Sequence, residues 1–367
     1  MTHALGTDER TEANANFFRA EAERVASLCH AMAERFDRGG RLLAFGDTPA
    51  ARSDVRHVAV EFVHPVIVGK RALPALGLEA DQVGLLAEPD DIAMAFGSLP
   101  DAVALARSRG CLTIAFAPSG AEWEFLPPSR DPAVRQELVE TLYHVLWELV
   151  HVFLEHADRG RTHDTGASSF LYPFLGEAKT DLAGVLEDVR RSVLAKSEEI
   201  GELRAQTLTE NRDELAAAAA DLRAVFDGGG KLLALGNGGS ATDAMDVVAD
   251  FAAHPCIDLT ADSAILTAIA NDIGPDAIFQ RQVIAYGRAG DALIALSTSG
   301  NSRNVIEALA EARRRGMRTI ALVGYDGGRV AAERLADHVI VTRSEHIPRI
   351  QEAQAGAYHV LCELVER

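Results

Sequence analysis

The chain has 367 residues, 48% of them hydrophobic, which is enough for about two domains with buried cores. Its 36 basic and 54 acidic residues give a net charge of −18, which argues against general binding to nucleic acid or to an anionic membrane surface. We expect a cytoplasmic protein without disulfides, because the N-terminus lacks the features of a signal peptide, no apolar run reaches the ~20 residues of a membrane span, and the four cysteines form no CxxC pair.

In the first part of the chain, short apolar segments alternate with helical patterns. FDRGGRLLAFG at 36–46, DIAMAF at 91–96 and RSRGCLTIAF at 107–116 each contain such an apolar segment. Alternating strands and helices predict a parallel sheet with helices on both faces.

Residues 158–176 are rich in Gly, Ser, Thr and Asp and lack helical periodicity, which is typical of a linker. The sequence therefore predicts a first domain at 1–157 and a second at 177–367. The second domain begins with a stretch at about 177–226 in which apolar residues recur every three or four positions, the spacing of a long helix.

The second domain repeats the first. The matching segments occur in the same order, and their offset grows from 190 to 215 along the chain. The matched pairs are 36–46 with 226–236, 107–116 with 313–322, and YHVLWELV at 143–150 with YHVLCELV at 358–365. The predicted fold class is therefore α/β, with two doubly wound parallel sheets flanked by helices and related by tandem duplication.

Two strands of the second copy end in loops that suit a phosphate. Residues 236–240, Gly-Asn-Gly-Gly-Ser, precede a helix; glycines allow close backbone approach, and a helix start offers free N–H groups and a positive dipole end. Another strand ends in STSGNS at 297–302, which places hydroxyl groups before a second helix. Because parallel strands end at one edge, we expect both loops to contact one phosphate.

Four segments in this order, GNGGSATDAM, AIANDIGPDAIF, STSGNSRNVI and RIQEAQAGAYHVLCELVE, resemble the sugar isomerase (SIS) domain. They are most similar to the phosphoheptose isomerases, which convert sedoheptulose 7-phosphate to a heptose 7-phosphate. The resemblance implies two SIS-type sheets, the first degenerate, with a sugar-phosphate ligand and no nucleotide cofactor. The implied ligand-binding residues are Asn237, Gly238, Gly239, Ser240, Asn271, Asp272, Ser297, Thr298, Ser299, Ser302 and Gln351.

In that family the helix after the glycine loop carries a His and, four residues later, a Glu, as metal ligand and as ligand or general base. Here the two positions hold Asp246 and Asp250, which share one helix face but offer harder donors than a His/Glu pair. The C-terminal helix supplies Gln351 and His359. The resemblance implies these four as metal candidates, with Asp250 and His359 catalytic. The alternative is that the two aspartates only occupy a solvated helix face and that His359 has a structural role.

The first copy has lost the phosphate-type loops but keeps the family's other residues. Pro49 stands in its first loop, and GSLPDA at 97–102 replaces STSGNS, so phosphate binding there is doubtful. A gap of one residue in the loop before this helix aligns His57 and Glu61 with Asp246 and Asp250. We prefer this alignment to an ungapped one because loops tolerate insertions more readily than helices do. The implied metal candidates, with zinc as the metal, are His57, Glu61, Gln136 and His144. Of these, Glu61 and His144 are also catalytic candidates, unless all four are inherited structural residues.

Gln136 and His144 lie eight residues apart, as do Gln351 and His359. Eight residues of helix rise about 12 Å, whereas zinc ligands lie ~2 Å from the metal, so such a pair should not share one ion. The family's tetramers have active sites at subunit interfaces. We therefore predict a homodimer that forms a pseudo-tetramer of SIS domains, with composite sites in which the second copy binds phosphate and the first supplies catalytic or scaffold residues.

The leading interpretation is a phosphoheptose-type aldose–ketose isomerase. A non-catalytic sugar-phosphate-binding or scaffold SIS protein is the alternative, which the two aspartates favour. A third is an isomerase of another substrate, such as an amino sugar phosphate; ammonia-dependent synthesis is not expected, because the chain has no glutaminase segment with an N-terminal cysteine.

Overall fold

The computed structural model describes residues 6–66, 70–158 and 182–367. The chain forms two compact units, one of Glu9–Gly201 and one of Met1–Asp8 with Glu202–Arg367. The predicted linker, 158–176, lies outside the described residues except for its first position. The predicted domain limits, 1–157 and 177–367, therefore stay predictions.

The first unit contains a five-stranded parallel sheet in the order β2-β1-β3-β4-β5. Its strands are β1 (Leu42–Gly46), β2 (Ala75–Leu78), β3 (Ile92–Phe96), β4 (Leu112–Ala115) and β5 (Trp123–Glu124). Its helices are α1 (Thr7–Asp37), α2 (Pro49–Val63), η1 (Ala80–Gln82), α3 (Val83–Leu86), α4 (Pro100–Ser108) and α5 (Pro132–Asp158).

The central strands of this sheet are buried on both faces. Leu42 and Ala44 face one core with α1, α2 and α5, whereas Leu43 and Phe45 face a second core with α3 and α4. Strands covered on both sides read as continuous apolar runs, which explains the pattern LLAFG.

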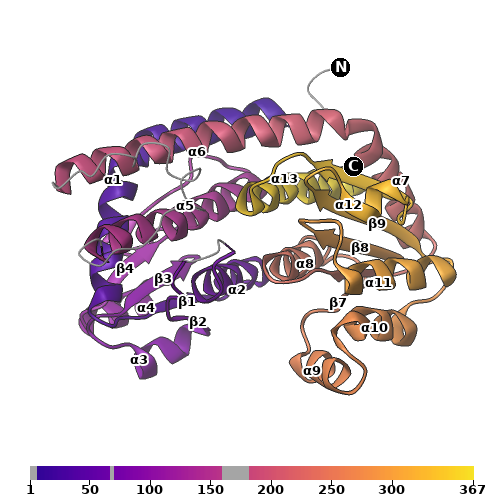
Figure 1. The fold of residues 1–367 in the computed structure, drawn as a ribbon, viewed down its shortest axis with the longest axis horizontal. Helices are drawn as coiled ribbons and strands as arrows, with labels where there is room; N and C mark the ends of the chain where they lie inside the picture. Colours follow the sequence, from indigo (N-terminus) through magenta and orange to yellow (C-terminus); the bar gives the residue numbers. More distant parts are fainter. Residues whose placement is uncertain (1–5, 67–69, 159–181) are drawn as a thin grey trace. The chain divides into compact units, whose positions relative to one another are not determined.

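The second unit has the same architecture, with strand order β10-β9-β8-β6-β7 (Figure 1). Its strands are β6 (Leu232–Leu235), β7 (Cys256–Asp258), β8 (Ala292–Ser297), β9 (Arg318–Gly324) and β10 (His338–Thr342). Its helices are α7 (Arg212–Asp227), α8 (Gly239–Asp250), α9 (Ser263–Asp272), η2 (Pro275–Ala277), α10 (Ile278–Tyr286), α11 (Arg303–Arg314), α12 (Gly328–Ala332) and α13 (Ile347–Glu366). One core packs α7, α8 and α13 on the sheet, and the other packs α10 and α11.

The two sheets are equivalent strand by strand. After β6 the chain adds β7 on one side and then crosses to place β8 on the other, as it does with β1, β2 and β3. Asp91 and Asp291 also occupy matching positions: each accepts a hydrogen bond from the backbone N–H that precedes the first strand, at 2.8 Å from Arg41 and 3.1 Å from Lys231. The predicted fold class, two doubly wound parallel sheets flanked by helices, is confirmed.

In the described part of the long helical stretch predicted at 177–226 there are two helices. Helix α6 (Leu182–Glu210) ends before Asn211, and α7 begins at Arg212. Asn211 hydrogen-bonds through its side chain to the backbone of Val341, as donor to O at 3.0 Å and as acceptor from N at 3.0 Å. Among the described residues, no helix has the length and apolar character needed to cross a membrane.

Candidate functional site

The glycine loop of the second unit lies at the point where the sheet changes direction. Strands β6 and β8 are parallel neighbours, so the loops that follow them emerge at one edge, and ligands of doubly wound sheets bind at such a switch point. Gly238 has φ 58° and ψ −126°, a conformation open to glycine. A Cβ on Gly236 would lie 2.1 Å from the backbone oxygen of Ser240. Both glycines are therefore required by the backbone path.

The loop after β8 gathers hydroxyl groups at the start of α11. The Oγ of Ser297 accepts a hydrogen bond from the N–H of Gly300 at 3.2 Å and lies 3.4 Å from the Oγ of Ser302. Ser299 accepts from the N–H of Asn301 at 3.2 Å. Ser302 precedes α11 without capping it through its side chain, so its hydroxyl can turn to a ligand. Thr298 is half-buried in the same loop.

An amide pair joins the two loops. Asn237, before α8, and Asn304, in the first turn of α11, exchange two hydrogen bonds of 3.0 and 2.9 Å. Sequence reasoning chose Asn237 but missed Asn304; the only signal was its place two residues after Ser302. The pair brings two helix N-termini together, which favours a bound anion such as a phosphate group.

A cluster of one histidine and two carboxylates follows on α8. The Nε2 atom of His359 lies 3.5 Å from Oδ2 of Asp246 and 3.6 Å from Oδ2 of Asp250. Asp246 and His359 are buried, whereas the side chain of Asp250 is 23% exposed. Tyr358 donates a hydrogen bond of 2.8 Å to Oδ2 of Asp246. Sequence reasoning missed Tyr358, although each copy carries a tyrosine immediately before this histidine.

The phosphate-type loop and the carboxylates occupy the same helix. Gly239 is the first residue of α8, and Asp246 lies seven residues later. Seven residues of helix rise about 10 Å, a separation that an extended sugar phosphate can span. One end of such a ligand can therefore contact the loops while the other contacts Asp250 and His359.

Cys362 lies beside this cluster, with its Sγ 3.5 Å from the backbone oxygen of Asp250. Burial, with the Asp250 carboxylate as the next contribution, raises the pKa of the Cys362 thiol to about 12. Because the thiolate is the reactive form of cysteine, Cys362 does not serve as a nucleophile near neutral pH.

The structure does not bring every predicted residue to this site. Asn271 and Asp272 end α9 in exposed positions, and within the described chain they hydrogen-bond to each other at 2.8 Å. Gln351 is buried on α13, about 12 Å of helix rise from His359. Their predicted roles as ligand-binding residues stay predictions.

The matching helix start in the first unit has fewer free N–H donors. Helix α2 begins with Pro49, which has no N–H, and the Oγ1 of Thr48 accepts a hydrogen bond from the N–H of Ala51 at 3.1 Å. Helix α4 likewise begins with Pro100 after Leu99, in place of the hydroxyl groups near α11. These two helix starts therefore offer a phosphate fewer donors than those of α8 and α11.

The first unit does assemble a compact set of metal-binding groups. His57, Glu61 and His144 are buried, and one ligand atom from each lies within 4.8 Å of the others. The Nε2 atoms of the two histidines are 3.3 Å apart, and Glu61 Oε1 lies 3.9 Å from Nε2 of His57. Two ligands of a tetrahedral zinc ion are separated by roughly 3.4 Å. This donor set therefore fits zinc, and Glu140 lies 4.0 Å from the other nitrogen of His57.

The same cluster supports the gapped alignment. His57 faces His144, whereas Arg56, which an ungapped alignment would place there, is exposed. The Nε2 of Gln136 donates to the Oγ of Ser53 at 3.5 Å. Each unit brings together one set of histidine and carboxylate candidates, and the roles of Gln136 and Gln351 as metal ligands stay predictions.

Known proteins resemble both the sequence and the fold. The phosphoheptose isomerase of Chlorobium phaeobacteroides is 48% identical over 174 residues, which cover 44% of this chain and 76% of that protein. The corresponding enzyme of Pelobacter propionicus is 47% identical over 42% of this chain and 84% of its own length. The family model described as "SIS domain" matches residues 197–324. The chain belongs to the SIS domain family.

The SIS fold extends beyond the matched segment. The C-terminal domain of glucosamine-fructose-6-phosphate aminotransferase from Francisella tularensis aligns with 100% of this chain and 96% of its own, with a TM-score of 0.64 and 11% identity. At that identity the likeness concerns the fold alone. The SIS match at 197–324 contains both phosphate-type loops and the aspartate pair, so sequence similarity is concentrated in the second unit.

Proposed function

We propose that this SIS protein is an aldose–ketose isomerase of the phosphoheptose isomerase type, which converts sedoheptulose 7-phosphate to a heptose 7-phosphate. The observation that carries the proposal is the composition of α8. This helix starts in the glycine loop and places Asp246 and Asp250 against His359. The phosphoheptose isomerases that match at 47–48% identity support the choice of substrate.

The phosphate of the substrate would bind between the starts of α8 and α11. The N–H groups at both helix starts and the hydroxyls of Ser297, Thr298, Ser299 and Ser302 supply the donors. These groups carry no full positive charge, so the helix dipoles provide the electrostatic attraction.

Isomerisation moves one proton between neighbouring carbons. Asp250, the most exposed group of its cluster, takes the proton from C1, the C1–C2 double bond forms, and His359 gives a proton to the carbonyl oxygen on C2. Asp250 then returns the first proton to C2, and the O1 hydroxyl proton passes to His359, which completes the aldose and restores both groups. Asp246, oriented by Tyr358, stabilises the protonated form of His359.

For the metal, we propose that His57, Glu61 and His144 bind zinc, because their spacing and their two imidazoles suit it. Bound zinc would supply Lewis-acid polarisation of an oxygen. The cluster of Asp246, Asp250 and His359 offers two carboxylates and suits a harder cation. Glu61 and His144 thus stay candidates for the chemistry, and the composite site that the sequence predicts stays a prediction.

A matched pair of variants tests the proposal. Purified protein should convert sedoheptulose 7-phosphate, and Asp250→Asn should lower kcat by about 10²–10⁴-fold, the usual effect of removing a general base. Glu61→Gln is the equivalent change in the first unit and should have a smaller effect. Both variants should keep ligand-induced thermal stabilisation by the sugar phosphate, whereas Ser299→Glu should abolish it by placing a carboxylate in the phosphate site.

The opposite ranking of the two variants would assign proton transfer to the first unit and support a composite site. Absence of turnover in the wild type, with stabilisation by the sugar phosphate retained, would favour the second candidate, a sugar-phosphate-binding scaffold. Two aspartates at the positions that carry His and Glu in the resembling family are the feature that favours this candidate.

A further inference from the structure

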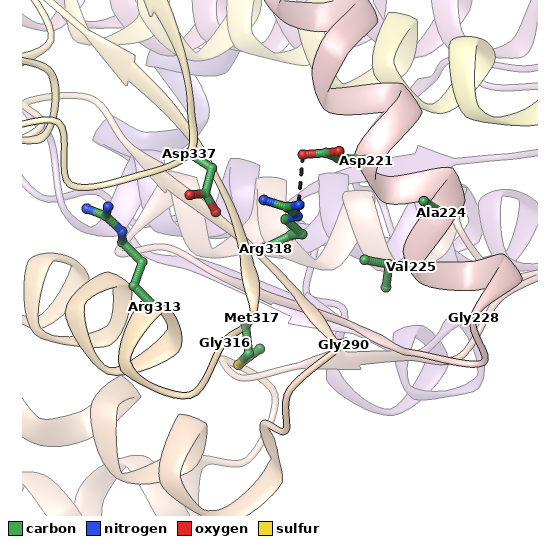
Figure 2. A pocket seen from close by; sticks show the side chains of 10 residues that line it. All are labelled: Asp221, Ala224, Val225, Gly228, Gly290, Arg313, Gly316, Met317, Arg318 and Asp337. Carbon is green, nitrogen blue, oxygen red and sulfur yellow. Dashed lines mark ion pairs between the residues drawn. The ribbon is translucent and has the colours of Figure 1, made fainter.

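The second unit has a cavity at the other edge of its sheet, where the strands begin. The cavity has a volume of about 570 Å³ and lies between the end of α7, the turn before β8 and the turn between α11 and β9 (Figure 2). Val225, Gly228, Gly290 and Gly316 line it. The proposed sugar-phosphate site is at the opposite edge, so the isomerase proposal leaves this cavity unused.

In the first unit, two arginine side chains fill the matching position. Arg35 donates from Nη1 to the backbone oxygens of Pro89 at 2.6 Å and of Gly110 at 2.9 Å. Arg38 pairs through Nε with Oδ1 of Asp90 at 2.7 Å. Alignment of 36–46 with 226–236 places Val225 where Arg35 stands and Gly228 where Arg38 stands. The second unit therefore lacks both guanidinium groups.

The surrounding backbone is equivalent in the two units. A Cβ on Gly40 would meet the backbone oxygen of Asp90 at 2.0 Å, and a Cβ on its counterpart Gly230 would meet that of Gly290 at 2.2 Å. The counterpart of Gly110 is Gly316, with φ 76° against 91°. Of the two carbonyl groups that accept hydrogen bonds from Arg35, that of Gly110 has a counterpart in the lining of the cavity, Gly316, whose oxygen also accepts a hydrogen bond of 3.4 Å from the N–H of Gly290.

The charged residues around the cavity are balanced. Arg318 pairs with Asp221 at 3.5 Å (Figure 2), and Asp221 also lies 3.0 Å from Nε2 of His338. Arg313 lines the cavity too and donates through Nη1 to the backbone oxygen of Arg334 at 2.8 Å. Asp337 accepts hydrogen bonds through Oδ2 from the N–H and the hydroxyl of Thr319, at 2.9 and 3.0 Å. Two guanidinium groups and two carboxylates suit a ligand that carries both charges better than a simple anion.

We propose that this cavity binds a small ligand that bears a guanidinium group together with a carboxylate, of which free arginine is the simplest example. Its guanidinium would occupy the place of the Arg35 side chain and donate to the backbone oxygen of Gly316, at the turn before β9. Its carboxylate would lie toward Arg313 and Arg318, which lie at the rim.

Isothermal titration with L-arginine tests the proposal, with L-citrulline as the matched control because it replaces the guanidinium by an uncharged urea group. We expect saturable binding of one arginine per chain and at least tenfold weaker binding of citrulline, since hydrogen bonds from a charged donor contribute about 1.5–3 kcal/mol. Equal binding of the two compounds, or binding of inorganic phosphate but not of arginine at this edge, would overturn the proposal.

Variants that introduce the arginines of the first unit at the matching positions of the second unit provide a second test. Gly228→Arg and Val225→Arg should each abolish arginine binding while stabilisation by sedoheptulose 7-phosphate is kept. Gly228 is exposed, with φ −77°, so Gly228→Arg keeps the test available if the buried Val225→Arg does not fold. The double variant Arg35→Val with Arg38→Gly, which removes both arginines of the first unit, should raise the stoichiometry from one to two. Arginine binding that persists unchanged in Gly228→Arg contradicts the assignment.

Discussion

At the residue scale, the orientation of Asp246 depends on a tyrosine 112 positions away. The hydroxyl of Tyr358 donates to the same oxygen, Oδ2, that lies 3.5 Å from Nε2 of His359. Neighbouring residues on a helix point in directions about 100° apart. Tyr358 and His359 therefore reach the carboxylate from different sides, and the tyrosine limits the rotation of the carboxylate.

Tyr358→Phe tests this positioning role. We expect kcat on sedoheptulose 7-phosphate to fall about 10- to 100-fold, the range seen when a residue that orients a functional group is lost, while KM changes little.

Tyr143→Phe is the matched control, since Tyr143 precedes His144 in the first unit as Tyr358 precedes His359. A comparable loss of kcat in this control, or a change in KM rather than in kcat in Tyr358→Phe, would argue that the tyrosines act only in packing.

At the element scale, the first residues of α2 and α8 decide what each helix start can bind. Thr48 and Pro49 satisfy or remove donors of α2, whereas Gly238 leads into α8 without a side chain. The difference in sequence is a few residues, but it changes a helix start from an anion-binding group to a capped structural one.

Substitutions at the two helix starts should affect different properties, stability at the start of α2 and sugar-phosphate binding at the start of α8. Thr48→Ala should lower the stability of the first unit by about 1 kcal/mol through loss of the cap and leave sugar-phosphate binding unchanged. Gly238→Ala should weaken that binding, because alanine is strained at φ 58° and ψ −126° even though a Cβ has free space there. Both tryptophans, Trp123 and Trp147, lie in the first unit, so their fluorescence in urea reports the effect of Thr48→Ala separately.

The connection between β1 and β3 predicts a pH-dependent contribution to stability. Asp91 accepts hydrogen bonds from Arg41 Nη2 at 2.7 Å and from the N–H of Glu88 at 2.9 Å. Burial opposes ionisation, but the hydrogen bonds from Arg41 and from the backbone outweigh it and hold the pKa of Asp91 below its ordinary value of 3.8. Such a group stabilises the folded state above its unfolded pKa, and this stabilisation is lost as the pH falls through the folded pKa.

Asp91→Asn should therefore cost about 2 kcal/mol near neutral pH, since hydrogen bonds to charged groups contribute roughly 1.5–3 kcal/mol. The difference from wild type should stay constant down to about pH 5 and shrink below about pH 4. Tryptophan fluorescence during urea unfolding at several pH values measures it, and a difference that grows on acidification would contradict the assignment.

Local patterns predicted the sheets well, because the central strands β1, β3, β6 and β8 are buried apolar runs and similar segments recur in both units in the same order. They failed where a distant contact decides the structure. Asn211 ends α6 because its side chain pairs with Val341, 130 residues away. The pairs Asn237–Asn304 and Tyr358–Asp246 were missed for the same reason. The aspartate pair and both histidines were found because they share a helix register with the motifs beside them.

At the scale of the whole molecule, the predicted homodimer depends on exposed apolar surface. Leu266 of helix α9 packs partly buried against the core of its unit, but no residue of this helix is fully buried, and the following Ile273 is 59% exposed. An apolar helix that is only partly covered in one chain is typical of an association surface.

Light scattering at micromolar concentration should therefore show a stable dimer, and Ile273→Asp should shift it toward the monomer by placing a charge in the apolar surface. A wild-type monomer would contradict the predicted dimer. A dimer that resists Ile273→Asp would show that Ile273 does not contribute to the interface.

The difference between Pro49 and Gly238 has a consequence for how this protein can evolve. In an oligomer of identical subunits, one codon serves every site, so a proline in the loop would disable all of them at once. In this chain the two loops have separate codons, and one can drift while selection acts on the other. Saturation mutagenesis under selection for activity should accordingly find many tolerated codons around 47–51 and few around 236–240. A chain with two such loops thus has one that is free to acquire a different role.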